Sequence, residues 1–136
     1  MLTLAIIKPD AVAAGTTGKI LDHLVQQGFR LRAATFLRLT TAQAEAFYAV
    51  HRERPFFRPL VTFMTSGPCL PLALERDDAV AKLREVIGAT NPKEAARGTV
   101  RAHYAESKER NAIHASDSEE NALREVGFFF AESQLV

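Results

Sequence analysis

The spacing of apolar residues changes from one segment of the chain to the next, and it predicts strands that alternate with helices. Residues Leu2 to Ile7 form an apolar run that stops at the turn Lys8-Pro9-Asp10. Such a run predicts a buried strand that carries a lysine to its carboxyl end, where ligand sites are common. From residue 18 to residue 27 the apolar positions recur at helical spacing, and Gly28 ends the predicted helix.

Three further segments have the features of strands. Residues Phe29 to Leu39 alternate between two sets of side chains, one of them rich in arginine, which is typical of a strand. The segments Leu70 to Glu75 and Ala112 to Ala115 predict the third and fourth strands.

Helical patterns fill most of the remaining chain. We expect a helix that Thr41 caps and that runs to about residue 50, and further helices over residues 60–65, 77–87, 99–105 and 117–127. A loop rich in turn residues should connect residues 89 to 98. Strands interleaved with helices predict α/β layering, with the helices on one face of a small sheet.

Length and charge narrow the class of protein. The chain has 136 residues, a typical size for one domain, so we expect residues 1–136 to form a single domain. It carries 17 basic and 16 acidic residues, a net charge of +1. This balance creates no broad positive field for a nucleic acid or an anionic membrane, so any anion site must be built locally.

The single cysteine and the first residues bear on the compartment. Cys69 has no second cysteine to pair with, and its apolar surroundings predict an inert, buried thiol. The start Met1-Leu2-Thr3 lacks the basic region and long apolar stretch of a signal peptide, and no apolar run reaches membrane-spanning length. We expect a cytoplasmic protein without a membrane partner.

One phosphate-binding motif can be set aside. The segment Gly15 to Lys19 resembles the end of a P-loop, but that motif needs a glycine where Ala13 stands and a serine or threonine where Ile20 stands. We interpret this segment as a turn and a helix start.

His114 is the most informative candidate for chemistry. It lies just before a helix-start signal, in which Ser116 and Glu119 have the spacing of a capping box. A helix amino terminus favours phosphate, and a neutral imidazole has a lone pair that can attack phosphorus. His23, His51 and His103 lack metal-ligand spacing, so a zinc site is not expected. The other candidates are scattered and individually weak: Lys8, Tyr48, Phe56, Arg84, Thr90, Asn91, Arg101, Asn111, Ser116 and Glu125.

Read together, these segments resemble the nucleoside diphosphate kinases over nearly the whole chain. The matching motifs occur in the family's order and spacing: Ile7-Lys8-Pro9-Asp10, Tyr48 through Arg54-Pro55-Phe56-Phe57, Thr65-Ser66-Gly67-Pro68, Gly88-Ala89-Thr90-Asn91-Pro92, Gly98-Thr99-Val100-Arg101, and Asn111-Ala112-Ile113-His114-Ala115-Ser116-Asp117. Each motif alone is weak, but their joint presence is specific.

The resemblance implies a fold and an activity. The fold would be α+β, a ferredoxin-like βαββαβ core with a four-stranded antiparallel sheet. The enzyme would transfer the γ-phosphate of a nucleoside triphosphate to a nucleoside diphosphate through a phosphohistidine. His114 matches the phosphorylated residue, Glu125 the glutamate that holds its other ring nitrogen, and Ser116 the serine that supports this glutamate.

The resemblance also implies the nucleotide ligands. Lys8, Arg84, Thr90 and Arg101 match phosphate-binding residues, and Mg²⁺ would be held mainly by the nucleotide phosphates and water, with no dedicated protein ligand. Further residues match a sugar ligand, a polar neighbour of the histidine and the ring on which the base stacks: Asn111, Tyr48 and Phe56. Stacking tolerates every base, so broad nucleobase tolerance follows.

The chain departs from the family pattern at a few positions. Ala11 and Ala115 stand where glycine is common, and Ala102-His103 stands where a small residue and an aspartate are usual. The chain ends soon after Phe128-Phe129-Phe130, without a longer extension that braces some hexamers. A homo-oligomer built from dimers is expected, and tetramer and hexamer both stay open.

Two alternatives from other functional classes stay open at this point. The first is a nucleotide-binding regulatory member of the same fold whose catalysis is incidental. The second is a ferredoxin-like RNA-binding module, which the nearly neutral charge and the lack of an aromatic-rich strand disfavour.

Overall fold

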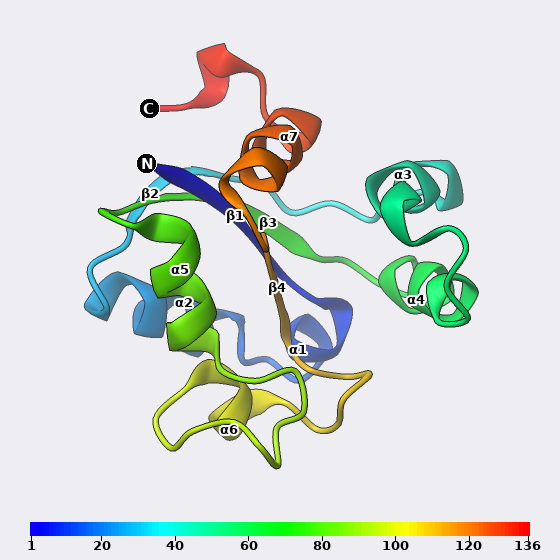
Figure 1. Ribbon diagram of the computed structural model, residues 1–136, viewed down its shortest axis with the longest axis horizontal. Helices are drawn as coiled ribbons and strands as arrows, with labels where there is room; N and C mark the ends of the chain where they lie inside the picture. The colour runs from blue at the N-terminus through cyan, green and yellow to red at the C-terminus, as the bar shows by residue number, and fades with distance from the viewer.

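The computed structural model describes all of residues 1–136, and its centre is an antiparallel sheet of four strands (Figure 1). The strands lie in the order β2-β3-β1-β4, and their bounds are Leu2–Ile7 for β1, Arg30–Ala34 for β2, Leu70–Glu75 for β3 and Ile113–Ala115 for β4. β1 is central and pairs with β3 on one side and with β4 on the other. The predicted α+β, ferredoxin-like fold with a four-stranded antiparallel sheet is confirmed.

Seven α-helices and two short 3₁₀ helices connect and cover the strands. The α-helices are α1 (Pro9–Ala13), α2 (Thr17–Gln26), α3 (Thr41–Phe47), α4 (Phe57–Met64), α5 (Ala79–Ile87), α6 (Val100–Tyr104) and α7 (Glu119–Phe129). The 3₁₀ helices are η1 (Ala49–His51) and η2 (Glu132–Gln134). None of these helices combines the length and the apolar character needed to cross a membrane.

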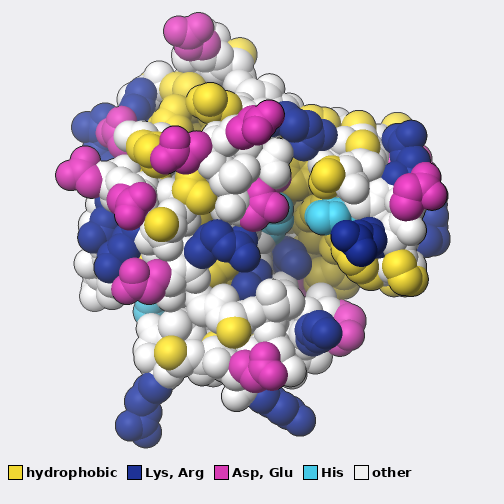
Figure 2. Space-filling view, in the orientation of Figure 1, with side chains coloured by type: hydrophobic (Ala, Val, Ile, Leu, Met, Phe, Trp, Pro, Cys, Tyr) yellow, Lys and Arg dark blue, Asp and Glu magenta, His cyan; other side chains and the backbone are white.

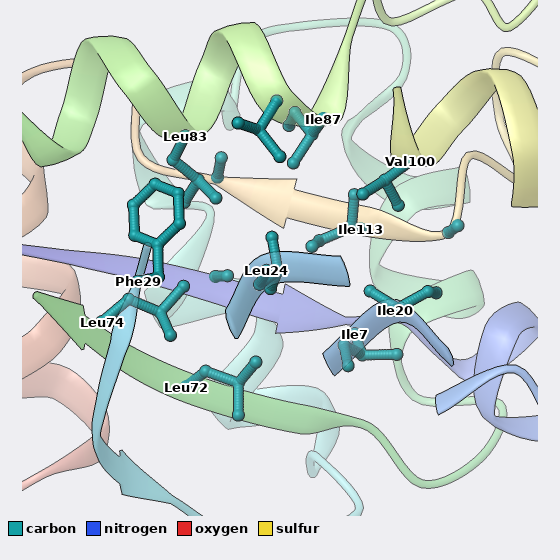
Figure 3. Packing of buried hydrophobic residues seen from close by; sticks show 14 of the residues in the cluster. Ile7, Ile20, Leu24, Phe29, Leu72, Leu74, Leu83, Ile87, Val100 and Ile113 are labelled. Atoms are coloured by element: carbon teal, nitrogen blue, oxygen red, sulfur yellow. The ribbon is translucent and has the colours of Figure 1, made fainter. Parts of the chain in front are cut away.

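Residues of β1 alternate between two hydrophobic clusters, one on each face of the sheet. Ala5 and Ile7 belong to the cluster that α2 and α5 cover, and Figure 3 shows Leu24, Leu83 and other side chains of these helices packed over the strands. Leu4 and Ile6 belong to the second cluster, whose other members include side chains of α3, α4 and α7. Burial of each such Leu or Ile contributes about 1.5–3 kcal/mol to folding.

The predicted arrangement, with helices on one face of the sheet, describes α2 and α5, the two helices of the βαββαβ core. The second face is covered as well, by α7 above the sheet and by the α3–α4 pair beside it (Figure 1). This second layer places α3, α4 and α7 on the side of β4 where His114 lies, as described below.

The second strand is shorter than its alternating pattern predicts. Its pairing with β3 shifts register between Leu31 and Ala33, and only an isolated bridge between Leu37 and Cys69 continues the ladder beyond β2. A bulge of this kind bends and twists the edge of a sheet, so the side-chain alternation outlasts the pairing. Cys69 is fully buried, as predicted.

The predicted helix caps also need correction. The amino-terminal cap of α3 is Thr40, which forms a capping box with Gln43, so the cap lies one residue before Thr41. The predicted capping box of Ser116 with Glu119 is wrong, because α7 is capped by Ser118. Ser116 still extends the sheet, since its backbone N–H donates to the carbonyl of Leu4, and its side chain points inward.

Candidate active site

His114 lies at the centre of β4, opposite Ile6 of β1, and its side chain is 19% exposed. Its Nε2 lies 2.8 Å from Oε1 of Glu125, which is buried on α7. The hydroxyl of Ser116 donates to the same carboxylate oxygen over 2.8 Å. The predicted approach of Glu125 beneath His114 is thus observed, and Ser116 fixes the carboxylate from the other side.

This arrangement distinguishes the two nitrogens of the imidazole. A carboxylate at Nε2 favours the tautomer that carries its proton there, so the lone pair of the neutral ring lies on Nδ1. Nδ1 makes no hydrogen bond within the chain. His114 therefore presents a nucleophilic nitrogen, with a buried anion behind it to stabilise positive charge on the ring.

Aromatic rings enclose the histidine on the side of α3. The ring of Phe47 meets His114 edge-on with centroids 5.4 Å apart, and the ring of Tyr48 does so at 6.1 Å. Burial, with Cys69 and Glu125 nearby, raises the pKa of Tyr48 far above its ordinary value, so the phenol stays neutral. Its hydroxyl is buried without a hydrogen-bond partner and remains available as a donor.

Cationic side chains from three elements gather near His114. Lys8, at the end of β1, donates from Nζ to Oδ1 of Asn111 over 2.8 Å, and Asn111 lies three residues before the histidine. Arg101 of α6 donates to the carbonyls of Gly88 at 3.0 Å and Ile113 at 2.8 Å. Lys8 and Arg101 are both buried.

Arg84 of α5 completes this group of cations. Its guanidinium is exposed and reaches the carbonyl of Ala115, the residue after His114, over 3.5 Å. The three positive charges repel one another, as the pKa values of two of them indicate. Burial and the charge of Arg101 lower the pKa of Lys8 to about 8, and burial and the charge of Arg84 lower that of Arg101 to about 10. An anion bound among them would relieve both the desolvation and the repulsion.

A cavity of about 460 Å³ lies beside these groups. Four of the predicted nucleotide-binding residues line it: Lys8, Phe56, Thr90 and Asn111. The ring of Phe56 is 48% exposed and packs against His51 with centroids 5.2 Å apart. The volume suits a nucleoside-sized ligand, with an aromatic face at one wall and hydrogen-bonding groups at another.

The other predicted site residues, His114 among them, do not line this cavity. Arg101 and Arg84 bind carbonyls of β4 on either side of His114, and Tyr48 contacts the histidine ring. The structure thus brings every predicted site residue to one region, around β4 and the carboxyl end of β1. A larger hollow of about 580 Å³ lies elsewhere, among ion-paired side chains that include Arg30 and Glu75, and holds none of them.

Comparisons with known proteins agree with this geometry. The family model described as "Nucleoside diphosphate kinase" matches residues 2–135. A protein of that name from Campylobacter curvus (strain 525.92) is 57% identical over 133 residues, covering 98% of this chain and 97% of the relative. Another, from Halorhodospira halophila (strain DSM 244 / SL1), is 56% identical, covering 98% and 94%. The chain belongs to the nucleoside diphosphate kinase family.

Solved structures of this family have the same fold. The Aquifex aeolicus nucleoside diphosphate kinase superposes with a TM-score of 0.98 at 48% identity, covering 99% of this chain and 98% of that one. The Halobacterium salinarum nucleoside diphosphate kinase, solved in complex with CDP, superposes with a TM-score of 0.95 at 37% identity, covering 100% and 91%. The chain is accordingly a nucleoside diphosphate kinase, an enzyme that transfers phosphate between nucleotides.

The chemistry of the site residues fits a magnesium ion carried by the nucleotide of this kinase. No three His, Cys, Asp or Glu side chains converge to hold a metal ion. Lys8 and Arg101, the two buried cations of the site, suit phosphate oxygens rather than a metal ion. Mg²⁺ prefers several water ligands together with substrate phosphates, and a site of this composition leaves it those ligands.

Several residues that line or support the cavity beside Lys8 were not predicted from the sequence. Leu60 and Phe63 of α4 line the cavity on the side of Phe56, and Lys108 and Glu109 line it from the loop before β4. Arg110 braces that loop against α4, with its guanidinium 5.7 Å from the centre of the Phe63 ring. None of these residues has a local pattern that marks it, because the cavity forms only when α4 and the loop meet.

We predict that nucleotide binding by this kinase weakens as Lys8 loses its proton. The pKa of Lys8, about 8 in the free protein, implies that ADP binds roughly tenfold more weakly at about pH 9 than at about pH 7, measured by calorimetry. Lys8→Met should bind ADP weakly at both values and lose most of this slope. The same slope in Lys8→Met would contradict the assignment.

The lowered pKa of Lys8 also makes the stability of the fold depend on pH, in the direction opposite to nucleotide binding. Below about pH 8, Lys8 is protonated in both the folded and the unfolded chain, and the fold carries the full cost of the buried charge. Between about 8 and 10.5 the unfolded chain keeps a proton that the folded chain releases. The contribution of Lys8 to the free energy of unfolding therefore rises with pH across this window.

Proposed function

We propose that this nucleoside diphosphate kinase works by double displacement on Nδ1 of His114. The Nδ1 lone pair attacks the γ-phosphorus of a nucleoside triphosphate, and the bond from phosphorus to the β,γ-bridging oxygen breaks as the diphosphate leaves. A terminal oxygen of a second diphosphate then attacks the same phosphorus, and the P–N bond breaks. The observation that carries this proposal is the 2.8 Å contact of Nε2 with the buried Glu125, which leaves Nδ1 free.

The roles of Glu125 and Ser116 follow from charge. The ring becomes cationic as the P–N bond forms, and a carboxylate at Nε2 stabilises that charge while it keeps the ring in one orientation. The Ser116 hydroxyl restrains the carboxylate through its own bond to Oε1. A nucleotide-binding regulator would have no use for this supported nucleophile, so that alternative is not favoured.

The cations would stabilise the transferred phosphoryl group. Phosphoryl transfer requires positioning and positive charge around the equatorial oxygens. We assign Arg84 and Thr90 to the distal phosphate of the diphosphate, Arg101 to the bridge toward the transferred group, and Lys8 to that group and the sugar. Tyr48, whose buried hydroxyl lacks a partner, is assigned as a polar neighbour of the histidine.

The nucleoside would occupy the cavity beside Lys8. Asn111, which already accepts from Lys8, is assigned to a sugar hydroxyl, and the exposed ring of Phe56 to the face of the base. Stacking on an aromatic ring depends little on which base is bound, so broad nucleobase tolerance is part of the proposal. Mg²⁺ would supply additional positive charge to the phosphates.

We also propose that residues 1–136 act as one domain in a cytoplasmic homo-oligomer built from dimers. The proposal of one domain is supported by the single sheet, whose two faces are both covered by helices. The proposal of a cytoplasmic location is supported by the lone, buried cysteine, which suits a reducing compartment. We propose neither a nucleic acid nor a membrane as a partner of this protein.

Initial-rate kinetics test the double displacement. With ATP as donor and UDP as acceptor, varying ATP at several fixed concentrations of UDP should give parallel double-reciprocal lines, because ADP leaves before UDP binds. Lines that intersect would indicate direct transfer within a ternary complex and would contradict the proposal. The same measurement with GDP and CDP tests the tolerance of the base.

A further inference from the structure

A strained turn precedes His114, and its central residue is an alanine. Ala112 has a φ of 75°, in the left-handed region that favours glycine, and it is completely buried. The N–H of Ile113 donates to the carbonyl of Asn111 over 2.9 Å, so the chain closes a γ-turn around Ala112. A non-glycine residue keeps such a conformation only where its surroundings hold it there.

Two polar groups hold the backbone of Ala112 on either side. Its N–H donates to Oδ2 of Asp10 over 3.0 Å, and its carbonyl accepts from the N–H of Lys8 over 2.9 Å. Asp10 lies on α1 and is 5% exposed, and its Oδ2 bond to Ala112 is the only side-chain bond it makes, since its Oδ1 is buried without a partner. The corner between β1 and α1 therefore clamps the turn.

The residues flanking the clamped turn are those that carry the proposed chemistry. Asn111, on one side, binds Nζ of Lys8, and Ile113, on the other, offers its carbonyl to Arg101. His114 follows directly. A change in the turn would move the sugar ligand, one cation and the nucleophile relative to one another.

We propose that Asp10 is a positioning residue of the active site, which holds Ala112 in its strained turn and thereby sets the placement of Asn111 and His114. The inference rests on the proposed function of His114 and deepens it. The side chain of Asp10 forms no hydrogen bond with the imidazole or with a residue of the cavity, and its negative charge raises the pKa of Lys8. We assign its effect on phosphoryl transfer to the backbone of Ala112, and the variant Asp10→Asn, which removes the charge but keeps an accepting oxygen, separates this route from the effect on Lys8.

The test combines removal of the clamp with relief of the strain. Asp10→Ala should lower the rate constant of phosphoenzyme formation from ATP by about 100-fold, the effect of a misplacement near 1 Å, while the Kd for ADP changes by less than about tenfold. Asp10→Asn keeps an oxygen that accepts from Ala112 and should retain most of the rate. The matched control is Asp22→Ala, since Asp22 is an exposed helical aspartate.

The double variant is decisive. Glycine adopts a positive φ without strain. The double variant Asp10→Ala with Ala112→Gly should therefore form the phosphoenzyme at least about tenfold faster than Asp10→Ala alone. A residue that merely stabilised the fold would not be rescued in this way. If Asp10→Ala does not fold, the double variant should fold and carry the test.

The outcomes separate this inference from the proposed function. Absence of a phosphoenzyme on the wild type would overturn the function of His114 and the inference together. A wild-type phosphoenzyme with an unchanged rate in folded Asp10→Ala would overturn the inference alone. The inference would also be overturned if the double variant were as slow as Asp10→Ala, or if Asp10→Asn lost as much rate as Asp10→Ala.

Discussion

His114→Ala should abolish nucleoside diphosphate kinase activity while the protein stays folded and still binds ADP. Removal of the imidazole removes Nδ1, the only group in the proposed mechanism that bonds to phosphorus, so we expect a loss of at least about 10⁴-fold in kcat. His114 is not part of either hydrophobic cluster, which is why the fold should persist. Coupled-assay kinetics, calorimetry with ADP and thermal unfolding give the three readouts.

The matched control for this variant is His51→Ala, which removes another partly exposed imidazole, one that lies in η1 and packs against Phe56. It should retain most of the activity. Transfer by His114→Ala at more than about one hundredth of the wild-type rate would argue that another group accepts the phosphate.

Glu125→Gln should lower kcat by about 100- to 1000-fold with a much smaller effect on the Kd for ADP. The variant keeps the size of the side chain but removes the negative charge that orients and stabilises the ring as it becomes cationic. The amide oxygen of a glutamine can still accept from both His114 and Ser116 at the position of Oε1, so the expected loss reflects the missing charge. Single-turnover formation of the phosphoenzyme is the measurement that isolates this step.

Two further variants test whether the loss of rate in Glu125→Gln is specific to that carboxylate. Ser116→Ala removes only the supporting bond, so its loss of rate should be smaller, about tenfold. Glu120→Gln changes an exposed carboxylate on the same helix and should leave the rate unchanged. An equal loss in Glu120→Gln would point to a general effect of charge on α7, and an unchanged rate in Glu125→Gln would contradict its role behind His114.

The sequence predicts the central strands well because the residues that flank each strand mark its ends. β1 is a continuous apolar run that a proline ends, and its predicted bounds, Leu2 to Ile7, are those observed. β3 is also predicted at its observed bounds. β2 is not, because the bulge after Leu31 is a property of its pairing with β3, which an alternating pattern does not record. α1 was missed since its five residues are too few for a helical period.

The site was predicted in part by local pattern and in part by resemblance. Lys8 and His114 stand out locally, one at the end of a buried strand and the other before a helix start. Glu125 and Arg101 look like ordinary residues of helix faces until the fold brings them to β4.

The prediction for Ser116 illustrates the limit of local pattern. The spacing of Ser116 and Glu119 fits a helix cap. Ser116 instead lies one residue after β4, where its hydroxyl donates to Glu125, and Ser118 caps α7. Asp10 was not singled out because its partner is a backbone N–H 102 residues away, whose conformation the sequence does not reveal.

The most direct test of the account is intact-protein mass spectrometry after brief incubation with ATP and Mg²⁺ at alkaline pH, followed by addition of GDP. The account predicts one phosphate on the wild type and none on His114→Ala, with the adduct discharged by GDP as GTP forms. A folded, active wild type that carries no phosphate, or an adduct that GDP does not remove, would contradict the phosphohistidine mechanism.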